Sequence, residues 1–231
     1  MPATLFEFRH RWWIIFAIFL VAFSTYSIDP KTSAVAIARW TAARVGTTAN
    51  ADSYRVVFAI GSLLVFIAAI LRSWGTSYLR ADVMRDSRVH TERLVADGPY
   101  RYVRNPLYIG NILLAVGVGL MASRIGFVIL VVGMTWFVLR LIHREEAELA
   151  RDQGEPYQRY CATVRRLLPS LTPRVPPAGN TPHWGPAIRV EAAYWLMALA
   201  IGAFAVTLNV RVFWTIFGCG VAATLLSRST K

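Results

Sequence analysis

The chain has 231 residues; 55% of them are hydrophobic, 16% are charged, and the mean hydropathy is +0.44. A water-soluble domain carries about 25% charged residues, so this chain has too few charges to cover the surface of one. The same composition excludes an intrinsically disordered chain. Two cysteines without a CxxC spacing or a histidine partner predict neither a disulfide scaffold nor a metal site. In so apolar a chain, the net charge of +12 is typical of the cytoplasmic side of a membrane protein rather than of a nucleic-acid-binding surface.

Six apolar segments meet or approach the length of about 20 residues that a membrane-spanning helix needs. They are residues 12–28, 55–71, 107–122, 125–142, 191–209 and 212–226. Only two residues separate the third from the fourth, so we expect these two to form a tight antiparallel hairpin. A weaker stretch, residues 33–44, is short and carries two arginines, and we expect it to lie on the bilayer surface. The sequence therefore predicts an all-α fold, a polytopic transmembrane helical bundle of about five or six spans.

The distribution of Lys and Arg predicts the orientation of this bundle. With a cytoplasmic N-terminus, 19 of the 25 basic residues lie on the cytoplasmic side and 6 on the other, as the positive-inside rule requires. Both long polar segments, about 72–106 and 143–187, then face the cytoplasm of an inner or plasma membrane. The N-terminal apolar run is too long for a cleaved signal peptide, so we expect it to be retained.

The first polar segment ends in a run rich in tyrosine and arginine. Residues 94–110 read LVADGPYRYVRNPLYIG. Asp97-Gly98-Pro99 has the chemistry of a turn, and Pro106 suits the first turn of the third span, with Asn105 as its N-cap. Taken alone, the run is equally typical of a loop with interfacial Tyr and Arg anchors.

The second polar segment continues the fourth span as a charged helix. Arg140, Arg144 and Glu148 form an i, i+4 row that would suit a solvated face. Glu145 follows the apolar residues by about one turn, where a carboxylate is costly without a cationic partner or a ligand. Residues 154–160, GEPYQRY, then predict a break, and a short basic piece follows at 164–169.

Together these motifs resemble the isoprenylcysteine carboxyl methyltransferase and phospholipid methyltransferase superfamily. The resemblance covers about residues 90–170 and rests on the order, the spacing and the placement of the motifs around a helical hairpin. It implies an integral membrane methyltransferase that uses S-adenosylmethionine at the cytoplasmic face and acts on a lipophilic small molecule or a lipid-linked acceptor, reached through the bilayer lipid.

Carried over by position, the resemblance also implies the site residues. The implied cofactor contacts are Leu94, Val95, Tyr100, Asn105, Pro106, Leu107, Tyr108 and Glu145. The implied catalytic and substrate-binding residues are Arg104, Arg140, Arg144 and Glu146. In the family an arginine precedes the glutamates; Leu141 stands at that position here, so Arg140 or Arg144 would replace it. Asn105 stands where the prenylcysteine enzymes have histidine and the phospholipid enzymes have asparagine, which leaves the acceptor open.

These residue types suit the chemistry that the resemblance implies. Glu145 would pair with the ammonium or sulfonium of the cofactor, and Arg104 with its carboxylate. A carboxylate acceptor needs no general base, whereas an amine acceptor must lose a proton, for which Glu145, Glu146 and His143 are the nearby candidates. No GxGxxG loop of a soluble methyltransferase occurs in the sequence.

The sequence divides into three parts. Residues 1–89 would hold the N-terminal spans and the surface helix, residues 90–175 the methyltransferase core, and residues 176–231 a two-span hairpin. The alternative to an enzyme is a membrane protein, such as a small transporter, built on the same scaffold. A transporter would be expected to place ionisable residues inside its spans, and the six segments have none near their centres. A nucleic-acid partner and a metal are not expected.

Overall fold

The structure is a computed structural model that describes residues 1–79 and 96–229, with side chains up to residue 224. In this part of the chain every regular element is a helix, and the one β-bridge, between Thr32 and Ser123, is isolated. The prediction of an all-α fold is therefore confirmed. Leu94 and Val95, two of the predicted cofactor contacts, lie outside the described residues.

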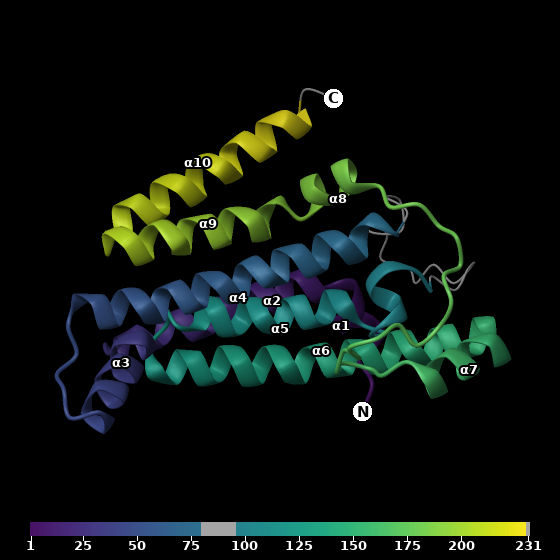
Figure 1. Cartoon of the computed structure of the whole chain (residues 1–231), viewed down its shortest axis with the longest axis horizontal. Helices are drawn as coiled ribbons and strands as arrows, with labels where there is room; N and C mark the ends of the chain where they lie inside the picture. Colours follow the sequence, from purple (N-terminus) through teal and green to yellow (C-terminus); the bar gives the residue numbers. More distant parts are fainter. Residues whose placement is uncertain (80–95, 230–231) are drawn as a thin grey trace.

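The N-terminal elements lead from one end of the bundle to the other (Figure 1). They are α1 (Leu5–Arg9), α2 (Arg11–Ser24), the 3-10 turn η1 (Thr25–Ser27) and α3 (Ser33–Arg44). Thr4 and Glu7 form a reciprocal capping box that starts α1. Helix α3 has the bounds predicted for the surface stretch, although its place on a bilayer stays a prediction.

Helix α4 (Ala51–Ser77) is the central helix, and it packs along both α5 (Pro106–Gly119) and α9 (Ala192–Thr207). Two glycines bring α4 and α5 close together. A Cβ added to Gly117 would lie 2.5 Å from the carbonyl oxygen of Gly61, too close for any side chain. The small residues let the two backbones approach, as expected for helices that pack in lipid.

The predicted hairpin is formed by α5 and α6 (Arg124–Gln153). Ser123 caps α6 by accepting a hydrogen bond from the backbone N–H of Gly126 at 2.9 Å. Helix α6 continues through the charged residues as far as Gln153, and Gly154, with φ of +61°, starts the break before α7 (Glu155–Thr163).

The C-terminal part consists of α8 (Trp184–Val190), α9 and α10 (Val210–Ser229). Helices α8 and α9 are bent by 63° at Glu191, and α10 packs on α9. The sequence predicted an apolar span over residues 191–209, and α9 lies within it; the short helix α8 and the bend before α9 were not predicted.

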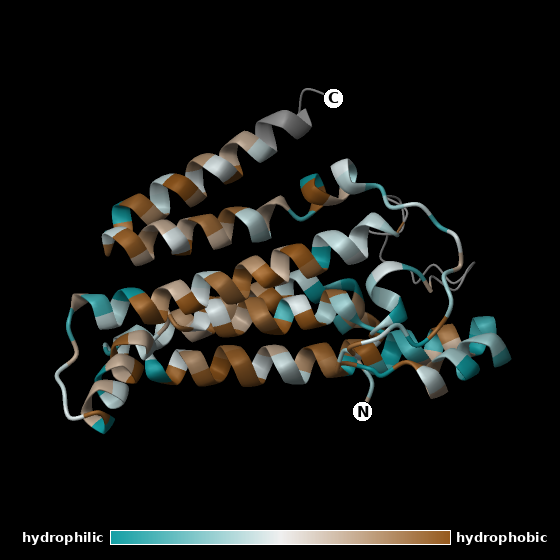
Figure 2. Ribbon diagram, in the orientation of Figure 1, coloured by the Kyte–Doolittle hydropathy of each residue, from teal (hydrophilic) through white to brown (hydrophobic). Residues whose placement is uncertain are grey.

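The apolar helices support an integral membrane protein. Helices α4 and α6 are long and apolar enough to cross a membrane, as is the bent α8–α9 pair if it counts as one span. Three further apolar helices, Arg11–Ser27, Pro106–Gly119 and Val210–Thr224, are shorter. All six predicted segments are thus helical, whereas the count of five or six spans stays a prediction. Figure 2 shows hydrophobic residues along the long helices and hydrophilic ones gathered near α7.

Candidate functional site

The candidate site lies where the start of α5, the charged end of α6 and the segment after α7 meet (Figure 1). Tyr108, in the first turn of α5, donates its hydroxyl hydrogen to Glu145 Oε1 over 2.6 Å. Residues 37 positions apart in the sequence are joined in this way because the α5–α6 hairpin returns the chain to the same end of the bundle. The predicted proximity of the helix-start motif and the glutamates is present in the structure.

Glu146 is buried, and both of its carboxylate oxygens have partners. Asn105 Nδ2 donates to Oε1 at 3.0 Å, and Arg166 Nε donates to Oε2 at 2.9 Å. Arg104 Nε lies 3.4 Å from Oε1 as a second cation. A buried carboxylate of this kind is stable because paired charges offset its lost hydration. These contacts tie the start of α5 to the segment after α7, so Glu146 holds the site together.

Asn105 occupies the N-cap position of α5 without capping it. Its side-chain amide instead donates to Glu146 and, at 3.2 Å, to the carbonyl of Arg166. Asn105 is therefore the N-cap residue, as predicted, but its side-chain amide bridges two segments instead of capping the helix. Pro106, at the first helical position, needs no donor partner there.

Arg104 is held in place by its backbone and by one arm of its guanidinium. Its backbone N–H donates to the carbonyl of Arg165 at 2.9 Å, and Nη1 donates to the carbonyl of Cys161 at 3.5 Å. Its Nε is buried and has no hydrogen-bond partner among the described residues. This nitrogen lies within ion-pair range of Glu146 but makes no hydrogen bond to it, so its donor is suited to an additional anionic group.

Arg140 and Arg144, the two candidate substrate arginines, are engaged by the N-terminal segment. Arg140 Nη2 donates to both oxygens of Glu7, at 2.9 and 2.7 Å. Arg144 pairs with Glu148 at 2.6 Å, as the i, i+4 spacing predicted, and donates to the carbonyl of Ala3 at 3.2 Å. The structure therefore shows these arginines docking the first residues against α6. A role in substrate binding stays a prediction.

Tyr100 belongs to the 3-10 turn η2 (Gly98–Arg101), which the structure packs against α4. Tyr100 is half-buried, and a Cβ added to Gly75 of α4 would lie 3.5 Å from its hydroxyl. Its carbonyl accepts a hydrogen bond from Tyr160 of α7 at 2.8 Å. Burial raises the pKa of both Tyr100 and Tyr160 well above the ordinary value. Both phenols are therefore neutral at any physiological pH and do not serve as bases.

Sequence reasoning missed two cations at this site. Arg166 was interpreted only as part of a basic amphipathic piece, yet it pairs with Glu146. Arg11, at the start of α2, lies with its guanidinium 4.6 Å from the centre of the Phe8 ring and interacts electrostatically with both Glu145 and Tyr108. Neither contact has a local signal, because each partner is more than 19 residues away along the chain.

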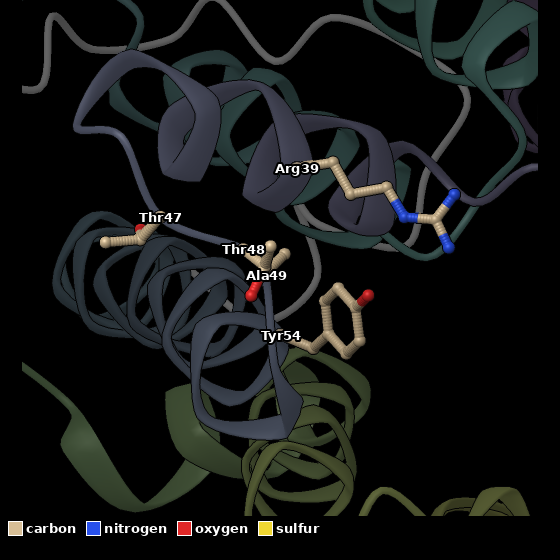
Figure 3. A pocket seen from close by; sticks show the side chains of 5 residues that line it. All are labelled: Arg39, Thr47, Thr48, Ala49 and Tyr54. Atoms are coloured by element: carbon tan, nitrogen blue, oxygen red, sulfur yellow. The ribbon is translucent and has the colours of Figure 1, made fainter.

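A hollow of about 340 Å³ lies at the opposite end of the molecule. Figure 3 shows its lining residues, Arg39 of α3, Thr47, Thr48 and Ala49 of the following loop, and Tyr54 of α4. None of the predicted site residues lines it, so it is separate from the candidate site. In the part of the chain that the structure describes, no group of three or more His, Cys, Asp or Glu residues could hold a metal ion.

Comparison with known proteins first gives a family to which part of the chain is similar. Residues 56–154 match the family model described as phospholipid methyltransferase. This region includes η2, the hairpin and both glutamates, and it ends before α7.

The particular relative found is Protein-S-isoprenylcysteine O-methyltransferase of Schizosaccharomyces pombe, 32% identical over 95 residues. The aligned region is 41% of this chain and 39% of that protein, so the chain spans about two fifths of the length of the relative. No solved structure matches. Both findings confirm the resemblance to the isoprenylcysteine carboxyl methyltransferase and phospholipid methyltransferase superfamily that was seen in the sequence.

Proposed function

We propose that this protein is an integral membrane methyltransferase that transfers a methyl group from S-adenosylmethionine to the carboxylate of a lipophilic, isoprenylcysteine-like acceptor. The observation that carries the proposal is the Tyr108–Glu145 hydrogen bond beside the buried Asn105–Glu146 contact, at the point where the apolar part of α6 ends. An acidic pair held there by long-range contacts indicates a built site. Similarity to the superfamily suggests the reaction class.

The donor set fits S-adenosylmethionine. The cofactor has an ammonium, a carboxylate and a sulfonium. Glu145 offers a carboxylate for a positive group, and the unmatched Nε of Arg104 offers a donor for the carboxylate. Tyr100 and Tyr108 offer ring faces for the adenine or the sulfonium. When bound, the cofactor supplies an electrophilic methyl group; contacts from Pro106, Leu107, Leu94 and Val95 are part of the proposal.

The protein's own part in this reaction is to position the acceptor and exclude water. Phe137, Leu141 and Ile142 of α6, one to two turns before Glu145, are at most 1% exposed, so the core on that side of the glutamate is apolar. A carboxylate acceptor already carries the electron pair that forms the new C–O bond, so no side chain has to remove a proton. Apolar surroundings favour this step because opposite charges are neutralised as the methyl group moves.

Phospholipid N-methylation is the second candidate, favoured by the family model that matches and by Asn105. An amine acceptor must be deprotonated, and the nearby bases already have partners. Glu146 accepts hydrogen bonds on both oxygens, Glu145 accepts one from Tyr108, and His143 Nε2 lies 3.1 Å from a guanidinium nitrogen of Arg166. This arrangement supports the carboxylate acceptor over the amine.

The proposal includes the placement in the membrane. Five or six helices would span the inner or plasma membrane, with the shorter apolar helices among them, and the N-terminus and the site would be cytoplasmic. The distribution of 19 basic residues on one side and 6 on the other supports this orientation. The acceptor would then reach the site laterally from the lipid, while the cofactor would enter from the aqueous side.

The test combines calorimetric titration with S-adenosylmethionine and methyl-transfer assays in detergent. The two probes are N-acetyl-S-farnesylcysteine, a carboxylate acceptor, and phosphatidylethanolamine vesicles, an amine acceptor. Glu145→Gln is expected to lower the rate of methyl transfer at least about 100-fold. The variant removes the negative charge that the proposal places beside the positive groups of the cofactor. Glu148→Gln, two residues from Glu146 but paired with Arg144, is the matched control and should retain activity.

Methyl transfer to the prenylated cysteine supports the proposal, and transfer to the vesicles alone would establish the second candidate. The absence of S-adenosylmethionine binding by well-folded protein would overturn both candidates. In that case the scaffold would belong to a membrane protein without methyltransferase activity.

A further inference from the structure

A fully buried ion pair joins α4 to the break between α8 and α9. Arg72 donates to Glu191 through Nε at 2.6 Å and Nη2 at 3.0 Å, and the two side chains are only 6% and 2% exposed. Thr76 adds a third hydrogen bond to Glu191 at 2.8 Å. Glu191 lies outside the residues that match the family model. The proposed reaction uses neither member of this pair.

The remaining arm of Arg72 reaches the start of α5. Its Nη1 donates to the carbonyl of Leu107 at 3.0 Å and to Asn111 Oδ1 at 2.7 Å. Tyr194 of α9 also donates to Asn111 Oδ1, at 2.5 Å. The planar guanidinium thus connects three helices, with the carboxylate on one side and the first two turns of α5 on the other.

Gly110 makes room for this connection. A Cβ at position 110 would collide with Cγ and Cδ of Arg72, so only glycine lets the arginine side chain pass along α5. Gly110 ends the tyrosine- and arginine-rich motif, and its smallness now has a specific reason. Gly110, within this motif, leaves the space in which the Arg72 side chain crosses α5.

The helix turn that Arg72 holds is the one that carries the candidate site. Leu107 is flanked by Pro106 and by Tyr108, and Tyr108 donates to Glu145. We propose that Arg72 and Glu191 are positioning residues that fix the first turn of α5, so that the C-terminal helices set the geometry of Asn105 and Tyr108. The consequence for methyl transfer rests on the proposed function; the positioning itself does not.

The cost of this arrangement argues against a role in packing alone. Burying two charges is expensive, and apolar side chains of similar volume usually stabilise a fold at least as well. A guanidinium group, in contrast, fixes the orientation of the groups that it binds, since its N–H donors lie in one plane. An ammonium has no such planar set of donors. The pair therefore contributes orientation of α5 that apolar contacts between α4 and α9 would not supply.

Arg72→Lys tests the proposal. Lysine keeps the charge and pairs with Glu191 but has no planar fork to reach Leu107 and Asn111 at the same time. The matched control is Ser73→Ala, which removes the 2.9 Å hydrogen bond from Trp195 at the same α4–α9 interface without touching α5. Two quantities are measured on the full chain in detergent: amide exchange of the peptide 104–112, and the dissociation constant for S-adenosylmethionine.

We expect about tenfold faster exchange and about 10- to 100-fold weaker binding in Arg72→Lys, with neither change in Ser73→Ala. Gly110→Ala should reproduce the effect by displacing the arginine. Glu191→Gln should do so as well, and if that variant does not fold, Arg72→Lys carries the test because its charges remain balanced.

Unchanged exchange in Arg72→Lys would overturn the proposal, as would equal changes in Arg72→Lys and Ser73→Ala. Faster exchange with unaltered cofactor affinity would also overturn the link to the site. If the wild-type protein does not bind S-adenosylmethionine, the proposed function fails, and the exchange comparison alone decides whether the pair positions α5.

Discussion

The two ends of the helical bundle use polar side chains in different ways. At the end that carries α3, Ser123 Oγ lies 2.6 Å from Thr25 Oγ1, and the carbonyl of Ser123 accepts a hydrogen bond from Ser33 at 2.9 Å. Arg124 pairs with Asp29 through two hydrogen bonds, at 2.9 and 3.0 Å. These contacts fasten the α2–α3 connection to the α5–α6 turn, and each donor has its acceptor.

At the other end, near α7, several cations gather around Glu145 and Glu146. Glu146 is approached by Arg104 and Arg166 and by the amide of Asn105, while Glu145 has the hydroxyl of Tyr108 and the charge of Arg11 nearby. Three buried arginine donors at this end, Nε of Arg104, Arg140 and Arg144, have no hydrogen-bond partner among the described residues.

The two ends of the bundle therefore differ in how their polar groups are paired. At the α3 end, groups that are 90 to 98 positions apart in the sequence close the bundle, and their donors and acceptors match. At the other end the groups that are brought together are mostly charged, and donors are left for a ligand. Substitutions at equivalent positions of the two ends should therefore have different effects.

The largest difference is expected between Glu146→Ala and Asp29→Ala. Removing Glu146 leaves the buried Arg104 and the half-buried Arg166 without a counter-charge, so the free energy of unfolding should fall by about 3 kcal/mol. Unfolding by denaturant titration in mixed micelles measures it.

Asp29→Ala is the control because it also removes one carboxylate from an arginine pair. Arg124 is 54% exposed at its side chain, so water replaces the lost partner and the loss should be clearly smaller. Equal losses from the two variants would show that the ends do not differ in this respect.

An intermediate effect is expected from a pair of hydroxyl deletions. Tyr108→Phe removes the donor to Glu145, which should raise the dissociation constant for S-adenosylmethionine about tenfold, the value of one hydrogen bond to a charged group. Calorimetric titration measures the change. Because the variant keeps the aromatic ring, the change reports the loss of the hydroxyl alone.

Tyr26→Phe is the counterpart at the opposite end. It removes a hydroxyl that donates to the carbonyl of Met121 at 2.5 Å. Cofactor affinity should be unaltered, although stability is reduced. A parallel loss of affinity in both variants would mean that the bundle responds as a whole and that Tyr108 has no specific role.

Much of the fold follows from the sequence. The apolar segments predict the six apolar helical regions, of which only α4 and α6 are long enough by themselves to span a membrane, and the two-residue connection at Ser123 and Arg124 predicts the hairpin. The break at Glu191 was missed, since an isolated glutamate beside an apolar run looks like the polar end of a straight span. Its partner, Arg72, is 119 positions away, and no local sequence pattern indicates such a pair.

The candidate site could be predicted in its location and less well in its contacts. Tyr108 and Glu145 were identified from the motifs, and the hairpin brings them together. Arg166 and the bridging role of Asn105 were not foreseen, because both depend on how the chain returns after α7. Local patterns give the residue types of a site; long-range packing decides which groups are satisfied by the protein and which remain for a ligand.

The smallest effect concerns the connection between α7 and α8, which Asp97 holds against η2. Its carboxylate accepts hydrogen bonds from the backbone N–H groups of Ala178 and Asn180, both at 2.8 Å, and from the Asn180 side chain at 2.7 Å. Burial raises the pKa of Asp97, but these hydrogen bonds lower it more, so the pKa lies below its ordinary value of 3.8.

Because the pKa is lower in the folded state, ionised Asp97 stabilises this connection at every pH above 3.8, and the contribution is lost as the pH falls through the folded-state pKa. Asp97→Asn should therefore speed tryptic cleavage after Arg174 at pH 7 by about 3- to 10-fold, the effect of losing a charge-assisted hydrogen bond. Asp29→Asn, at the opposite end, should leave that cleavage unchanged. Under pepsin, wild type and Asp97→Asn should converge as the pH drops below 3.8. A difference that persists in strong acid would show that the carboxylate's shape, and not its charge, secures the connection.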